Sequence, residues 1–275
     1  MPMSITFTKS SPVLVGPSSM APATHNTTIN LSSFDKGLAF LPSKSFYVFK
    51  HAMQHKPAAE TVRTALSHAL THYFPLAGRL VRGGDDELRI ACTVEGVAFV
   101  AASANCSLDD VKLFDRPFAE LLLQELSASL AGVEGFRESD DPLLLIQVTE
   151  FSCGGFVIGV TWNRGVADAE GNVGGGPLGV SSTAESEMAV LRDGEQLQVM
   201  LRYDALVVSS WKNIGVDAVD FGGGRPARVM GRVDMAVPNC IACLPYEGKD
   251  GANVLVQCVK EGDVDAFLGE VAKFV

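Results

Sequence analysis

Histidine and cysteine side chains are the first candidates for chemistry in this 275-residue chain. Four of the histidines form two pairs with a spacing of four residues: His51 with His55, and His68 with His72. This spacing permits metal ligation, but neither pair belongs to a motif with a supporting glutamate. Cys240 and Cys243 form a C-x-x-C pair, and a structural zinc site would need a second such pair. We therefore predict no metal site.

The glycine-dense segment 172–179, NVGGGPLG, is the next candidate because glycine allows a close approach of the backbone to a ligand. Its residues lack the G-x-x-x-x-G-K-[ST] order of a phosphate-binding loop. We predict no nucleotide site there.

Charge and hydropathy limit the partners and the cellular location that we expect for the chain. The 22 Lys and Arg residues against 32 Asp and Glu give a formal charge of -10, which disfavours nucleic acid and anionic membrane surfaces as partners. The first residues lack the basic and apolar regions of a signal peptide, and no later run reaches the roughly 18 apolar residues of a membrane span. We expect a cytoplasmic protein with six reduced cysteines: Cys92, Cys106, Cys153, Cys240, Cys243 and Cys258.

The hydrophobic pattern predicts elements that alternate between helix and strand. Apolar residues recur at steps of three and four from Pro57 to Pro75, which predicts an amphipathic helix, and a second helix is expected over 117–130. Strands are expected at 45–49, then at 87–94 and 97–103, which we interpret as a hairpin across a Glu95-Gly96 turn. The apolar arms 143–151 and 156–163 predict a second hairpin, covered on both faces.

The last third of the chain continues the mixture. We expect strands at 207–211, 228–237 and 253–259, a weak helix at 187–203, and a final helix that Asp263 caps. The fold class is therefore α/β or α+β.

Five stretches, in order, carry a resemblance to a known family. They are Leu31–Asp35 (LSSFD), Tyr73–Leu80 (YFPLAGRL), Gln147–Gly155, Asn163–Gly171, and Asp220–Pro226 (DFGGGRP). On these stretches the chain is identified as a member of the plant BAHD acyltransferases. The resemblance implies a fold like that of chloramphenicol acetyltransferase: two domains of mixed sheets with flanking helices, and an active site in a channel between them. It also implies an acyl-CoA co-substrate, no other cofactor, and a small alcohol or amine acceptor.

The resemblance assigns roles to Arg164 and Asp168. The family carries H-x-x-x-D-G, in which the histidine removes the acceptor's proton and the aspartate fixes the local geometry. Here the aligned residues are Arg164, Asp168 and Ala169. A guanidinium offers no lone pair and stays protonated, so Arg164 cannot act as the base. We expect weak activity or none.

A second family motif, D-F-G-W-G, supports the structure away from the chemistry. This chain has DFGGG: Asp220, Phe221, Gly222, Gly223 and Gly224. Gly223 replaces the tryptophan, which removes a large apolar anchor. We expect a locally softer loop.

The chain is also shorter than members of the family. We predict an N-terminal domain at 1–171 and a remnant of the C-terminal domain at 172–275, with an internal block lost near Glu170 to Asn172. The channel is then incomplete, and strands without neighbours would expose their edges. Such a chain is expected to be marginally stable, to self-associate, or to bind another chain.

Three hypotheses for function follow. The chain is an acyltransferase with residual activity, a non-catalytic relative that binds a ligand or partner, or the product of a decayed gene.

Overall fold

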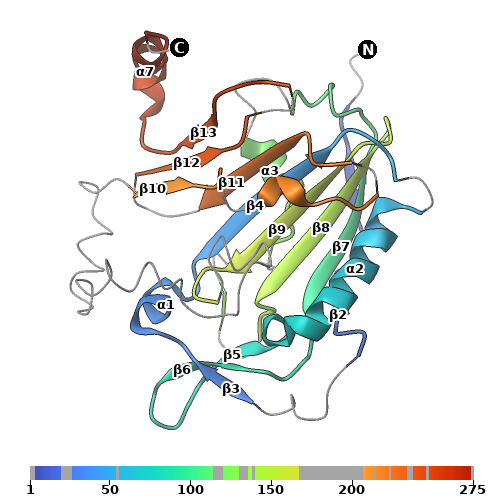
Figure 1. Cartoon of the computed structure of the whole chain (residues 1–275), viewed down its shortest axis with the longest axis vertical. Helices are drawn as coiled ribbons and strands as arrows, with labels where there is room; N and C mark the ends of the chain where they lie inside the picture. Colours follow the sequence, from blue (N-terminus) through green and yellow to red (C-terminus); the bar gives the residue numbers. More distant parts are fainter. Residues whose placement is uncertain are drawn as a thin grey trace.

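The computed structural model describes residues 4–19, 27–53, 56–113, 120–129, 136–137, 140–166, 207–212, 215–222, 224–233, 238–245 and 248–273. A seven-stranded sheet forms the centre (Figure 1). Its strands run in the order β1 (Phe7–Lys9), β7 (Val97–Ala104), β8 (Leu144–Phe151), β9 (Phe156–Asn163), β4 (Pro42–Phe49) and β11 (Arg228–Val233), and β2 (Val13–Val15) also pairs with β7. Only the β7–β8 pair is parallel among these.

Two three-stranded sheets flank the central one. The first joins β3 (Thr28–Asn30), β6 (Leu88–Ala91) and β5 (Arg79–Arg82). The second joins β10 (Val207–Ser210), β12 (Asn239–Cys243) and β13 (Asn253–Val256). The mixture of helices and mixed sheets confirms the predicted α/β class.

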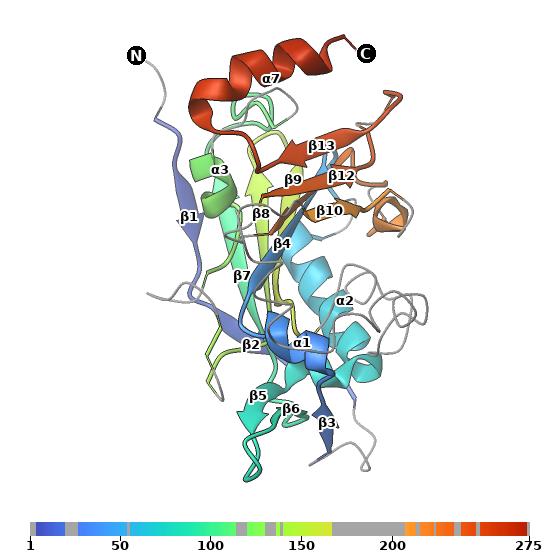
Figure 2. The ribbon, with the colours of Figure 1, turned by 90° about the vertical axis from the view of Figure 1, so that its left-hand side faces the viewer.

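Helices cover both faces of the central sheet (Figure 2). On one face, α2 (Ala58–His72) buries Val62, Leu66 and Leu70 against apolar side chains of β8 and β9. On the other, α3 (Glu120–Glu125) packs with its neighbouring turn on Phe46 and Val157. Since β8 and β9 are covered twice, nearly all their residues are buried, as the sequence predicted.

The remaining helical elements of the described ranges are short. They are α1 (Ser33–Leu38), the 3₁₀ turns η2 (Phe74–Ala77), η3 (Val216–Ala218) and η4 (Glu261–Asp263), and the last helix α7 (Val264–Val271). Asp263 is the N-cap residue of α7 as predicted, although its side chain makes no capping hydrogen bond. No helix in the described ranges is long and apolar enough to cross a membrane.

The predicted hairpin of 87–94 with 97–103 is wrong in its pairing. Both strands exist, but β6 pairs with β3 and β5, whereas β7 pairs with β1, β2 and β8. The intervening residues carry the chain from one sheet to the other. Gly96 has φ +105° and a Cβ there would lie 2.8 Å from the Val15 carbonyl oxygen, so this glycine is needed for the crossing.

Two helices differ from their predictions. Residues 33–38, for which no helix was predicted, form α1 because Ser32 caps the helix through its Oγ. The helix predicted at 117–130 is described only as α3, which ends at Glu125. After Glu125 the chain runs against the central sheet, where the Thr161 hydroxyl donates to the Ala128 carbonyl (3.2 Å).

The predicted boundary at 171/172 lies outside the described residues, as does the expected helix at 187–203, and both stay predictions. Within the described part, β11 pairs with β4 along six residues, from Arg228 opposite Val48 to Val233 opposite Ser43. The central sheet therefore contains strands from both sides of that boundary.

Candidate active site

Arg164 lies at the end of β9, where the chain leaves the central sheet. The Arg164 N–H donates to the Leu41 carbonyl (2.9 Å), just before β4, and the Asn163 N–H donates to the Leu143 carbonyl (3.0 Å), just before β8. The turn is thus tied to both neighbouring strands. The Arg164 side chain is half-buried, so this corner of the sheet holds a fixed positive charge.

Asn163 shapes the turn, a role that was not predicted for it from the sequence. Its side chain is fully buried, and its Oδ1 accepts a hydrogen bond from the Gly165 N–H (3.0 Å), while its carbonyl accepts from the Val166 N–H (3.0 Å). An asparagine that bonds to the backbone two residues later is a common turn signal. That signal was present in the sequence immediately before Arg164.

Gly165 brings the turn against α1. A Cβ at this position would lie 2.5 Å from the Asp35 carbonyl oxygen and 2.7 Å from the Ala39 Cα. Only glycine fits this approach without moving one of the two backbones. The first and fourth family-like stretches, far apart in the sequence, are therefore in contact.

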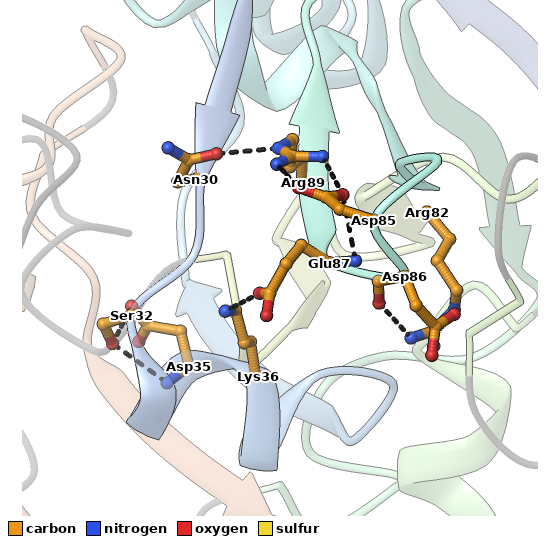
Figure 3. A network of polar contacts seen from close by, with 9 residues as sticks. All are labelled: Asn30, Ser32, Asp35, Lys36, Arg82, Asp85, Asp86, Glu87 and Arg89. Carbon is orange, nitrogen blue, oxygen red and sulfur yellow. Dashed lines mark hydrogen bonds and ion pairs between the residues drawn. The ribbon is translucent and has the colours of Figure 1, made fainter.

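A polar network anchors α1 to the β3-β6-β5 sheet (Figure 3). Ser32 Oγ accepts from the Asp35 N–H (3.1 Å) and donates to the Asp35 carboxylate (2.6 Å), and Lys36 pairs with Glu87. Behind it, Arg89 donates to both Asp85 oxygens (2.7 and 2.5 Å), and these bonds hold the pKa of Asp85 below its usual range. These exposed pairs position a helix and show no feature of catalysis.

The DFGGG loop is held by its own aspartate. Asp220 Oδ1 accepts from the Gly222 N–H (2.7 Å) and the Gly224 N–H (3.1 Å), and both glycines have positive φ, +87° and +97°. The Phe221 ring packs edge-on against Phe49, with centroids 6.1 Å apart. The loop is thus a stabilised turn with one aromatic anchor in the core.

The structure does not bring Arg164 and the DFGGG loop together. Arg164 follows Asn163, which pairs with Pro42, whereas Phe221 contacts Phe49, which pairs with Phe156. These are the two ends of β9, seven residue steps of about 3.3 Å each, or roughly 23 Å apart. The other two predicted residues, Asp168 and Gly223, lie outside the described part of the chain.

The histidines do not replace the missing base in the described part. His51, His68 and His72 are exposed, and His68 Nδ1 lies 3.1 Å from Ser18 Oγ beside α2. Within the described residues, no group of three or more His, Cys, Asp or Glu side chains could hold a metal ion.

An apolar cavity of about 340 Å³ lies between α2 and the central sheet. Its walls include Val62, Ala65 and Leu66 of α2, Ile146 and Ile158 of the sheet, and Phe221 of the DFGGG loop. Ala65 is only half-buried, so the cavity reaches the surface beside the helix. Its volume falls within the roughly 300–1,000 Å³ of small-molecule pockets.

Comparison with known proteins places these features in a family. A family model described as Transferase family matches residues 3–173. Acyl transferase 15 of Oryza sativa subsp. japonica is 41% identical over 176 residues, covering 62% of this chain and 39% of the rice protein. Fatty alcohol:caffeoyl-CoA acyltransferase of Arabidopsis thaliana is 35% identical over 166 residues, covering 58% of this chain and 37% of that protein. The match therefore spans less than two-fifths of either relative.

Solved structures share the fold at low sequence identity. Vinorine synthase superposes with a TM-score of 0.65 at 17% identity, covering 90% of this chain and 94% of that chain. TRI101 of F. sporotrichioides, complexed with coenzyme A and T-2, gives a TM-score of 0.53 at 13% identity, covering 88% and 97%. The family match over 3–173 and this shared architecture lead to one conclusion: the chain belongs to the Transferase family of BAHD acyltransferases, with the expected chloramphenicol acetyltransferase-like fold.

Proposed function

We propose that this chain is a BAHD acyltransferase relative in which acyl transfer from an acyl-CoA to a hydroxyl or amine acceptor is weak or absent. The observation that carries the proposal is Arg164 at the end of β9, the position that the family resemblance gives to the base. A protonated guanidinium cannot accept the acceptor's proton. General-base assistance contributes roughly 10²- to 10⁴-fold in rate, which is about 3 to 5 kcal/mol of barrier.

The co-substrate class follows from the relatives. An acyl-CoA is the donor named for the Arabidopsis relative, and we extend that class, not the particular acyl group, to this chain. Coenzyme A is polyanionic and the whole chain carries -10, so binding would need a local basic surface. We also propose a cytoplasmic location, where acyl-CoA donors are available.

The test is release of free CoA thiol from several acyl-CoA donors, with phenolic, aliphatic alcohol and amine acceptors. For the native chain and for Arg164→Gln, which has neither the charge nor a base, we expect acceptor-dependent thiol release that is weak, less than a hundredfold above the protein-free rate, or absent. Arg164→His restores the base alone. Its rate of thiol release is expected to stay low, because the predicted loss of the internal block leaves the channel incomplete. Native turnover at least a hundredfold above background that depends on the acceptor would contradict the proposal.

A second candidate function is non-catalytic binding of a small apolar ligand, and the cavity beneath α2 favours it. Among the described residues that line this cavity none is charged, and Tyr47 and Tyr73 are the two with a polar group. Burial raises the pKa of Tyr47, so this phenol stays neutral at physiological pH. Such walls suit a neutral aromatic or aliphatic molecule.

The neutral dye N-phenyl-1-naphthylamine tests this candidate by its fluorescence on binding. We expect saturable binding to the native chain and at least a tenfold weaker affinity for Ala65→Phe, which fills the cavity from α2. Thr64→Phe places the same ring on the exposed side of α2 and is the matched control. Equal affinity in both variants would exclude the cavity as the binding site.

A further inference from the structure

Cys240 and Cys258 lie side by side in the sheet near the C-terminal end. Cys240 is on β12 opposite Val256 of β13, and the pairing continues because the Gln257 N–H donates to the Asn239 carbonyl (2.8 Å). Cys258 follows directly. The two Sγ atoms are 3.7 Å apart, and both residues are half-buried.

The C-x-x-C spacing in the sequence pointed to a different partner, Cys243. Along β12 burial alternates, with Asn239, Ile241 and Cys243 buried and the two residues between them half-buried. Cys243 therefore faces the core and Cys240 faces the other side of the strand. Strand alternation separates the thiols that are close in sequence, and strand pairing joins thiols that are 18 residues apart.

We propose that Cys240 and Cys258 are an oxidative modification site, which hydrogen peroxide converts to an intramolecular disulfide. A disulfide has an S–S length of about 2.05 Å, so the sulfurs must approach by about 1.7 Å from the observed 3.7 Å. In the described part of the chain this is the one Sγ–Sγ contact recorded between cysteines.

The surroundings of the two thiols give them different roles. Cys258 lines a surface groove against α7, beside Lys260 and Ala266, so a small oxidant reaches it first. Burial raises the pKa of the Cys240 thiol to about 11, and the neighbouring Cys258 adds to this rise. Cys240 is then the protonated partner that reacts second.

The reaction balances with one peroxide. The Cys258 thiolate attacks the O–O bond, takes one oxygen as a sulfenic acid and releases hydroxide, which becomes water with the proton that Cys258 lost. The Cys240 sulfur then attacks the sulfenic sulfur, the S–S bond forms, and the departing hydroxide takes the Cys240 proton as a second water. The two cysteines lose two electrons and the peroxide gains two.

The product would join β12 to the segment that leads into α7. This segment, from Cys258 to Lys260, leads into η4 and then α7, and no residue of α7 is buried. A bond at Cys258 would limit the movement of that segment relative to the sheet.

The test is peptide mapping of the native chain after mild peroxide treatment, removal of peroxide, and blocking of free thiols with N-ethylmaleimide. Trypsin separates Val233–Lys249, which holds Cys240 and Cys243, from Asp250–Lys260, which holds Cys258. We expect these two peptides to be linked, two hydrogens lighter than their sum, with one maleimide on the remaining cysteine. Treatment in concentrated guanidinium chloride is expected to abolish this preference.

Two variants test which cysteines form the disulfide. Cys243→Ala is expected to keep the linked pair, and Cys240→Ala is expected to lose it and to trap the Cys258 sulfenic acid as a dimedone adduct. A link that persists in Cys240→Ala would overturn the proposal, since it would run to Cys243. Full maleimide labelling of Cys240 and Cys258 in the peroxide-treated native chain would also overturn it.

Discussion

Gly165 is the residue of the candidate turn at which any side chain would meet backbone atoms. The Asp35 carbonyl oxygen and the Ala39 Cα lie 2.5 and 2.7 Å from the place of a Cβ, and backbone cannot rotate away as a side chain can. Arg164 next to it changes the chemistry of the site. Gly165 sets its geometry, because it lets the end of β9 lie against α1.

Gly165→Ala should therefore destabilise the fold by overpacking, by about 1–3 kcal/mol of unfolding free energy. Urea denaturation followed by fluorescence of the two tryptophans measures this change. Gly84→Ala is the matched control, because a Cβ at Gly84 meets nothing within 4 Å and its φ is not in the left-handed region. Equal stability of the two variants would show that the contact with α1 is not tight.

Cys243 is a buried thiol whose ionisation links stability to pH. Burial is the main cause that raises its pKa from 9.0 to about 11. A raised folded-state pKa means that the stabilisation is complete below pH 9 and is lost as the pH rises toward 11. The shift of about two pH units corresponds to about 2–3 kcal/mol.

Cys243→Ala should reduce the slope of unfolding free energy against pH between 9 and 11. The native chain is expected to lose about 2–3 kcal/mol more than the variant over this range. Cys240 titrates in both proteins, and the Cys243 thiolate contributes to the raised pKa of Tyr47 in the native chain alone. Urea denaturation at several pH values, with reductant present, gives the comparison. Parallel curves would show that the pKa of Cys243 is the same in the folded and the unfolded chain.

Among the elements, the passage from β6 to β7 is held by a buried arginine. Arg79 on β5 donates to the Gly78 and Gly96 carbonyls (2.7 and 2.9 Å) and pairs with Glu95 (3.3 Å), and its side chain is 3% exposed. It therefore fixes the loop at Gly96 where the chain changes sheets. Burial lowers the pKa of Arg79, and Glu95 opposes that shift.

Arg79→Met should leave both carbonyls without their charged donor and cost about 2–4 kcal/mol of unfolding free energy. The cost can be measured by thermal or urea denaturation. Arg82→Met is the control on the same strand, because Arg82 and its partner Asp86 are exposed and such pairs contribute about 0–1 kcal/mol. A similar loss in both variants would contradict the role given to Arg79.

The sequence predicted elements well and their pairing less well, for a physical reason. Apolar periodicity located α2, and runs of apolar, aromatic and β-branched residues located β4, β8 and β9, because burial on one or both faces requires such residues. The same pattern says nothing about which strand lies alongside, so β6 and β7 were joined wrongly. The β11–β4 pair was not foreseen at all, since the two strands are far apart in the chain.

At the candidate site, the motif gave Arg164 but not the residues that place it. Asn163 and Gly165 act through contacts with the backbone, one within the turn and one with α1. The role of Gly165 could not be predicted from the sequence, because it depends on contact with α1. Residues 33–38 are too few to show the apolar repeat of a helix. The Ser32-x-x-Asp35 spacing was the available sign of a helix start.

At the scale of the whole molecule, α7 presents an unburied apolar stripe. Val264, Leu268 and Val271, at steps of four and three, are 38%, 48% and 40% exposed. Figure 1 shows α7 beyond β13 at one end of the molecule. Contiguous exposed apolar side chains favour association, which supports the expectation that the chain self-associates.

Leu268→Lys should therefore weaken concentration-dependent self-association. Size-exclusion chromatography with light scattering is expected to show a mass that rises with concentration for the native chain and at least a tenfold higher dissociation constant for the variant. Ala266→Lys adds the same charge on the other side of the helix and is the control. A native chain that stays monomeric at all concentrations would contradict the expected self-association.

The β4–β11 pair has a consequence for synthesis on the ribosome. Strand β9 is complete at Asn163, but β4 gains its second neighbour only after Val233, which is 70 residues later. At roughly 5–20 residues per second, this takes about 4–14 s. During that interval the nascent chain carries a sheet in which β4 pairs with β9 on one side and with nothing on the other, so we expect chaperone engagement to depend on translation speed through this stretch.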